Sequence, residues 1–272
     1  MTPLPREPAH RIENSQLKKL DNEPAFKVIV NKEYWNSAAI LFVYHSNRLS
    51  KLDHSITHTT RIINSFVKHQ FNCESDIIKI LEQKPLMRRE IIQHYCLMKE
   101  IFEGIKKYML LSVELIQSWH RVLMDHIITN KGQYRAEEIV SENHIFIECQ
   151  QIPKMMDSLV RQYNEYRAQS KQSPYALAAW LSHSFLCINP FSDGNGRLSR
   201  ILENYVLFSY GFPCPVSCPT HDHEEYQQAL SLADRDFVNG RNTSLLAHVI
   251  LKNSNSIYNN YLLNKILENE FQ

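Results

Sequence analysis

Helical spacing of apolar residues dominates this chain and most restricts the fold that it can adopt. In one segment after another, apolar residues recur every three or four positions, which gathers them on one side of an α-helix. Glycine is scarce, with 6 in 272 residues. We therefore predict a mainly α-helical protein. The expected helices cover residues 34–49, 57–71, 84–108, 152–168 and 174–188, and two more begin at Ser112 and near Arg197.

The segment 174–188 is expected to be the most buried helix, because apolar residues occupy nearly its whole circumference. Ser173 is placed to cap this helix, and Pro174 suits its first position. Pro190 should end it, since the residue before a proline is pushed out of the helical region. The next helix is expected to end at Gly211.

One short segment carries a β-strand pattern. β-Branched residues lie on either side of a polar turn between Ile139 and Ile147, as in a hairpin. This is the only convincing strand signal in the sequence. We expect a helical bundle with a short β-hairpin, and we divide the chain into a proline-containing leader (1–30), N-terminal helices (31–83), a core domain (84–251) and a C-terminal helix (252–272) that packs on the bundle or supplies a partner surface.

Composition excludes several kinds of partner. With 30 basic and 29 acidic residues the formal charge is +1, so no global field attracts nucleic acid or an anionic membrane. No apolar run reaches membrane-spanning length, and the N-terminus lacks the apolar core of a signal peptide. We expect a cytoplasmic protein whose oligomeric state the sequence leaves open.

The 6 cysteines are widely spread, which favours free thiols over a disulfide framework. Cys214, Cys218, His221 and His223 fall within ten residues and could in principle surround zinc. Their spacing is not a usual zinc pattern, however, and an ordinary loop explains them as well.

The segment that carries chemistry is Asn-Pro-Phe-Ser-Asp-Gly-Asn-Gly-Arg-Leu-Ser-Arg, residues 189–200. It joins a buried helix to the start of the next one, where unpaired N–H groups favour an anion. Asp193 can hold Mg²⁺, and Arg197 and Arg200 share one helix face from which both can reach a polyphosphate. Taken alone, an ordinary turn followed by a solvated helix face explains the segment equally well.

The complete string closely resembles the signature of the Fic family (Fido fold), His-Pro-Phe-x-Asp/Glu-Gly-Asn-Gly-Arg-x-x-Arg. Every specified position matches except the first, which is Asn189. Upstream, Gly132-Gln133-Tyr134-Arg135 and the expected hairpin resemble the family's Gly-x-Tyr-Arg and target-docking flap. Downstream, Tyr226 and Asp234 fall where family members contact the nucleotide, although asparagine is commoner at the second position. The resemblance covers residues 84–251 and implies a Fic/Fido helical bundle.

Fic proteins of the protein adenylyltransferase type transfer AMP from ATP to a hydroxyl of a target protein. The resemblance implies Asp193 as the Mg²⁺ ligand, Arg200 as the γ-phosphate contact and Phe191 as an anchor that orients the loop. The remaining implied positions are the α- and β-phosphate contacts Gly194, Asn195, Gly196 and Arg197, and the flap residues Ile139, Val140, Ile145 and Phe146, which would hold a target segment by strand addition.

Asn189 departs from the family at the position of the catalytic histidine. The family histidine deprotonates the attacking hydroxyl, and a carboxamide cannot do so near neutral pH. Loss of a general base typically costs about 10²- to 10⁴-fold in rate. We therefore expect Mg-ATP binding with weak or absent transfer. His183 is expected to be a satisfied core histidine, and His144 in the flap is a less favoured replacement base.

Three other interpretations stay open. The chain could be a working adenylyltransferase, it could be a helical interaction module without a nucleotide, or Asn189 could have been introduced by mutagenesis.

A second departure concerns regulation. Many Fic proteins carry an inhibitory helix with Ser/Thr-x-x-x-Glu-Gly/Asn, and residues 44–51 resemble it, with Ser46 at the first position. Ser50 takes the place of the glutamate, and Asp53 could replace that glutamate only if the helix shifted register. We expect a packing helix that no longer inhibits.

Overall fold

The computed structural model describes residues 32–68, 86–105, 110–141, 144–169, 172–235 and 242–270. Within these residues the chain is mainly helical, which confirms the predicted fold class. Among the described helices, none combines the length and the apolarity that crossing a membrane requires. The helices are α2 (Lys32–Leu49), α3 (Ile56–Lys68), α5 (Leu86–Gly104), α6 (Val113–Leu123), α7 (Ile152–Gln169), α8 (Pro174–Ile188), α9 (Asn195–Ser209), α10 (His223–Arg235) and α11 (Ser244–Glu270).

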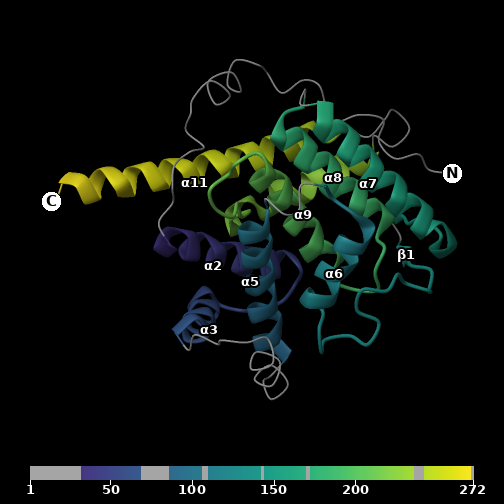
Figure 1. Ribbon diagram of the computed structural model, residues 1–272, viewed down its shortest axis with the longest axis horizontal. Coiled ribbons are helices and arrows are strands. Elements are labelled where there is room, and N and C mark those ends of the chain that lie inside the picture. Colours follow the sequence, from purple (N-terminus) through teal and green to yellow (C-terminus); the bar gives the residue numbers. More distant parts are fainter. Residues whose placement is uncertain are drawn as a thin grey trace.

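Helix α8 lies at the centre of the bundle, as its apolar circumference predicted. It packs against α7, α9 and α11, and Figure 1 shows these helices around it. Leu177, Trp180 and Phe185 are completely buried in the core. Because every side of α8 is covered, the loop that leaves its C-terminal end is held by a rigid element.

The N-terminal helices belong to the same core. Helices α2 and α3 pack against α5, and α2 also contacts α9. Trp35 and Phe42 of α2 and Ile63 of α3 are buried in the hydrophobic cluster that includes α8 and α9. The expected ends 69–71, 84–85 and 106–108 of two helices lie outside the described residues.

The ends of α8 and α9 differ in detail from the prediction. Ser173 is the N-cap residue of α8 and Pro174 begins the helix, as expected, although the Ser173 hydroxyl makes no capping hydrogen bond. Asn189 ends α8 in the left-handed region (φ 47°, ψ 61°), which asparagine tolerates better than most residues. Helix α9 begins at Asn195, two residues before Arg197, and Gly194 serves as its N-cap with φ 79°.

The β-hairpin consists of β1 (Val140–Ser141) and β2 (His144–Ile145). The strands are antiparallel, with Val140 opposite Ile145 and Ser141 opposite His144. At the other end of the chain, α11 runs without a break through the expected boundary at 251–252 and extends past the bundle (Figure 1).

Replacing Leu177 by alanine should destabilise the fold by about 2–5 kcal/mol, because the surrounding helices cannot close the resulting cavity. The matched control is Leu110→Ala, at a residue that is 71% exposed, for which about 0.5 kcal/mol or less is expected. Urea unfolding of both variants measures the difference. Equal losses would contradict the central position of α8.

Candidate functional site

The loop between α8 and α9 is fixed by an aromatic anchor. Phe191 is completely buried, and its ring stacks on His120 of α6 with 3.7 Å between centroids and 5° between planes. The Tyr134 ring lies beside it at 5.8 Å. The loop therefore has a defined path without any ligand.

Hydrogen bonds within the loop reinforce this path. The Asn195 side chain accepts a hydrogen bond from Phe191 N–H (3.1 Å) and donates one to Phe191 O (2.7 Å). Gly194 cannot carry a side chain, because a Cβ would lie 2.8 Å from Met124 Sδ at a positive φ. Gly194 N–H donates to Asp193 Oδ1 (2.6 Å). The first N–H groups of α9, beginning with that of Asn195, are therefore the backbone donors that can face an anion.

His120 connects this loop to the segment before the hairpin. Gly132 N–H donates to His120 Nδ1 (2.7 Å), so Nε2 carries the proton and donates to Asp193 O (3.0 Å). Burial lowers the pKa of His120 to about 4, against a smaller opposing effect of the bond to Asp193. The ring is therefore neutral near pH 7, and both nitrogens are used for positioning.

Arg135 holds the hairpin base against the end of α8. Its backbone N–H donates to Pro190 O (2.9 Å), and its Nε donates to Asn189 O (2.9 Å). Its guanidinium also donates to Glu137 O and Ile147 O, on either side of the hairpin. The backbone at Asn189 and the base of the hairpin are thus joined by one buried side chain.

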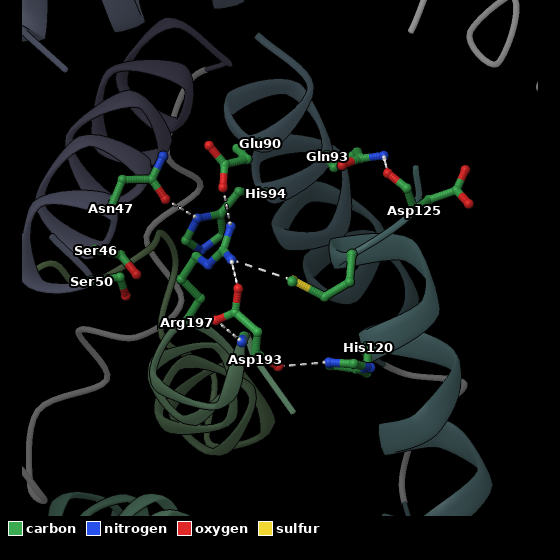
Figure 2. A network of polar contacts seen from close by, with 12 residues as sticks. Ser46, Asn47, Ser50, Glu90, Gln93, His94, His120, Asp125, Asp193 and Arg197 are labelled. Atoms are coloured by element: carbon green, nitrogen blue, oxygen red, sulfur yellow. Dashed lines mark hydrogen bonds and ion pairs between the residues drawn. The ribbon is translucent and has the colours of Figure 1, made fainter. Parts of the chain in front are cut away.

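Arg197 is buried between α5 and α9 (Figure 2). Its guanidinium lies 3.4 Å from Glu90 Oε1, 3.3 Å from Met124 Sδ and 3.9 Å from Asp193 Oδ2. Burial raises the pKa of Glu90, and the charge on Arg197 opposes that rise. The Asp193 side chain is 63% exposed, so its carboxylate remains accessible to solvent while Glu90 supplies the buried counter-charge.

Arg200 is also buried and is bound by α2. Its Nε donates to Ser46 Oγ (2.8 Å), and its Nη2 donates to Ser46 O (2.8 Å) and Ser50 Oγ (2.6 Å). Asp53 forms its ion pair with Arg48 rather than with Arg200. Helix α2 therefore contacts this arginine through neutral oxygen atoms.

Asn189 occupies the position at which the Fic signature has its histidine. Its carboxamide has no lone pair that titrates near neutral pH. His183 does not replace it, because its Nε2 is bonded to Asp234 Oδ1 at 2.9 Å and its side chain is buried. The side chain of His144 lies outside the described residues.

Tyr226 and Asp234 have partners inside the protein. Tyr226 OH donates to Glu203 Oε1 (3.0 Å), and both side chains are buried. Burial raises the pKa of Glu203 to about 7. Asp234 is bonded to His183. The two side chains expected to contact a nucleotide are thus used in bonds between helices.

The loop that contains Cys214, Cys218, His221 and His223 is not a metal cluster. His223 Nε2 donates to Cys218 O (3.1 Å), Cys214 is buried, and the His221 side chain is 79% exposed. Among the described residues, a group of possible ligands forms elsewhere, at His183, Cys187 and Asp234.

Sequence reasoning missed Glu90 and His120. Both residues lie on the apolar side of their helices. Glu90 is four residues before another polar residue, His94, and His120 lies four residues from the apolar residues Ile116 and Met124 on either side. A polar residue at such a position signals a buried hydrogen bond or ion pair. Their partners, however, come from α9 and from the loop before it, which spacing alone does not reveal.

The pKa of His120 predicts a pH-dependent contribution to stability. Between pH 6.5 and 4 the unfolded chain binds a proton that the folded ring excludes, so this contribution is complete above pH 6.5 and is lost as the pH falls through 4. Over this range the wild type should lose roughly 2–3 kcal/mol more than His120→Gln. Urea unfolding at several pH values measures this, with His58→Gln at an exposed histidine as control. Parallel curves for wild type and His120→Gln would contradict the assignment.

Comparisons with known proteins agree on one family. The model of the Fic/DOC family matches residues 110–207. A "Fido domain-containing protein" of Dictyostelium discoideum is 53% identical over 141 residues, which are 52% of this chain and 98% of that protein. A "Protein adenylyltransferase Fic" of Drosophila ananassae is 29% identical over 146 residues, which are 53% of this chain and 29% of that protein. The chain thus spans less than a third of the fly protein.

Solved structures show the same fold. A Fic domain containing signaling protein from Bacteroides thetaiotaomicron has a TM-score of 0.69 at 22% identity, and the match covers 92% of this chain and 94% of that one. A Fic family protein from Desulfovibrio desulfuricans has a TM-score of 0.72 at 15% identity, and the match covers 99% of this chain and 78% of that one.

Proposed function

The chain belongs to the Fic/DOC family, and we propose that it binds Mg-ATP at residues 190–200 while transferring AMP to protein weakly or not at all. The observation that carries this proposal is the combination of a preorganised loop at the start of α9 with Asn189 in the position of the general base. The first part supports nucleotide binding, and the second removes a group that transfer needs.

The donor set around the loop fits a magnesium-bound polyphosphate. Asp193 offers a carboxylate that is 63% exposed, and magnesium prefers one or two carboxylates with phosphate oxygens and water. When bound, the ion would offset phosphate charge. Asn195 and Gly196 place backbone N–H groups at the positive end of α9, where an anion is stabilised, while Gly194 N–H donates to Asp193 Oδ1.

The two arginines complete the phosphate site in different ways. Arg200 is held by hydroxyl and carbonyl oxygens of Ser46 and Ser50, and a phosphate oxygen makes a stronger, charge-assisted bond than these neutral acceptors. Arg197 keeps Glu90 as its counter-charge, which offsets the cost of burying the guanidinium. Tyr226 and Asp234 are not included among the proposed nucleotide contacts, because Tyr226 is bonded to Glu203 and Asp234 to His183.

Transfer would then depend on positioning alone. A carboxamide at position 189 can orient a hydroxyl but cannot take its proton. Charge stabilisation by the loop and its arginines can support residual transfer activity without a general base. The two described histidines discussed above do not supply one, because both nitrogens of His120 and Nε2 of His183 are already bonded.

The hairpin is the proposed docking element for a target protein. Ile139, Val140, Ile145 and Phe146 flank or form its two short strands, and an extended segment can add to an open strand edge. Arg135 ties the hairpin base to Asn189 and Pro190. A segment docked there would lie beside the position where a hydroxyl must be activated.

A second candidate function is active protein adenylylation. It is favoured by the similarity of this chain to several protein adenylyltransferases, among them the Drosophila ananassae protein. The two candidates differ in the consequence of restoring a histidine.

Asn189→His should convert a binding protein into a transferase. Both forms should bind Mg-ATP by calorimetry with similar affinity, because the loop is held by groups other than the Asn189 side chain. The variant should transfer α-labelled AMP to protein at least about 10²-fold faster, the typical contribution of a general base.

Arg200→Ala is the non-binding control in this experiment, and Arg161→Ala, at an exposed arginine, is its matched partner. Equal labelling by the wild type and Asn189→His would support the active enzyme. An absence of ATP binding by both forms would contradict the proposed function.

Ser50→Glu should weaken Mg-ATP binding. A carboxylate at this position would pair with Arg200, whose Nη2 already donates to Ser50 Oγ, and would compete with phosphate. A charged hydrogen bond of about 1.5–3 kcal/mol corresponds to at least tenfold lower affinity. Thr57→Glu adds the same charge at an exposed position of α3 and should leave the affinity unchanged. Unchanged affinity in Ser50→Glu would contradict the role of Arg200.

A further inference from the structure

His183, Cys187 and Asp234 form a compact group outside the loop at residues 190–200. His183 and Cys187 lie one turn apart on α8, so their side chains project from the same helix face. Asp234 reaches them from the last turn of α10. Among the described residues this is the group whose ligand atoms, an imidazole nitrogen, a thiol sulfur and a carboxylate oxygen, all lie within 4.8 Å of one another.

The distances within this group are close to those along one face of a tetrahedral zinc site. Cys187 Sγ lies 3.7 Å from His183 Nε2 and 3.7 Å from Asp234 Oδ1. His183 Nε2 lies 2.9 Å from Asp234 Oδ1. Ordinary zinc bond lengths in a tetrahedron separate such atoms by about 3.3–3.6 Å. For all three atoms to reach zinc, Nε2 and Oδ1 would move apart by a few tenths of an ångström and the His183 ring would turn to aim Nε2 at the ion, because Sγ lies almost as close to Nδ1 (3.8 Å).

The charges of the three side chains and the softness of the sulfur ligand also favour Zn²⁺. One thiolate and one carboxylate neutralise Zn²⁺ while the imidazole stays neutral, which suits a site where His183 and Cys187 are 1% and 2% exposed. A thiolate ligand selects zinc over magnesium or calcium. The Asp234 side chain is 35% exposed, so the ion and a water as fourth ligand have a path from solvent.

A Cys-His catalytic pair explains the geometry less well. Cys187 Sγ is nearly equidistant from the two ring nitrogens of His183, at 3.8 Å from Nδ1 and 3.7 Å from Nε2. A pair that exchanges a proton needs the sulfur in line with one nitrogen at hydrogen-bond distance. The buried thiol is also closed to a substrate.

We propose that His183, Cys187 and Asp234 bind one zinc ion that fastens α10 to α8. Helix α10 otherwise makes its main contacts with α11, and a metal bridge would attach it directly to the central helix. An ion that binds only the folded chain raises stability by mass action. This site is separate from the magnesium position at Asp193 and does not depend on nucleotide binding.

The test uses the untagged 272-residue chain, which has been treated with a chelator and dialysed. Zn²⁺ is titrated against a competing chromophoric chelator, and Co²⁺ is added separately to detect the thiolate-to-cobalt charge-transfer absorption. We expect one equivalent of either ion, the charge-transfer absorption in the wild type, and a higher melting temperature with Zn²⁺.

Cys187→Ser should abolish the Co²⁺ charge-transfer absorption, whereas Cys218→Ser, at a half-buried cysteine in the loop near His221 and His223, should keep it. Asp234→Asn retains a partner for His183 and changes a partly exposed group, so it should fold normally and bind Zn²⁺ at least tenfold more weakly. The proposal is overturned if the wild type binds no stoichiometric Zn²⁺, or if Asp234→Asn binds it as tightly, or if Cys218→Ser alone loses the absorption.

Discussion

Two buried positive charges on α9 organise the part of the protein around the loop. Arg197 and Arg200 are 3% and 6% exposed, and a buried charge is tolerated only when other groups compensate it. Glu90 of α5 compensates the first, and oxygen atoms of Ser46 in α2 and of Ser50, directly after α2, compensate the second. Asn47 of α2 and His94 of α5 join these helices through a further hydrogen bond of 3.0 Å, shown in Figure 2. The N-terminal helices are therefore part of the site.

The path of the loop between α8 and α9 is fixed by packing and hydrogen bonds within the protein. Phe191 stacks on His120, the Asn195 side chain closes the loop, and Arg135 binds the backbone at Asn189. Asparagine suits the left-handed conformation at position 189, so a carboxamide there leaves the backbone path unchanged. The path of the loop is therefore set by side chains other than that of Asn189.

Local sequence rules predicted where most helices and the hairpin lie, but they predicted fewer of the first and last residues of these elements. The spacing of apolar residues predicted the described helices except α10 (His223–Arg235), for which no helix was expected, and Pro190 correctly predicted the end of α8. Helix α9 begins two residues before Arg197, near which its start was expected, and Gly194 caps it through a positive φ that spacing does not encode. Ser173 was expected to cap α8 from its residue type alone, yet its hydroxyl makes no capping bond. Glu90 and His120 were missed since their partners are distant in sequence.

The sequence by itself determined the helical class, the central position of α8 and the family, because apolar periodicity and a contiguous signature are written in consecutive residues. Only the tertiary structure decided which charges are compensated and which polar atoms meet. Glu90 and Arg197 are 107 positions apart, and Arg200 and Ser50 are 150 apart. The same holds for possible metal ligands: the neighbouring Cys214, Cys218, His221 and His223 do not form a cluster, whereas Asp234 joins His183 across 51 positions. Such pairs form because burial forces polar groups from separate helices to find partners, and nothing in the local pattern specifies which partner each will meet.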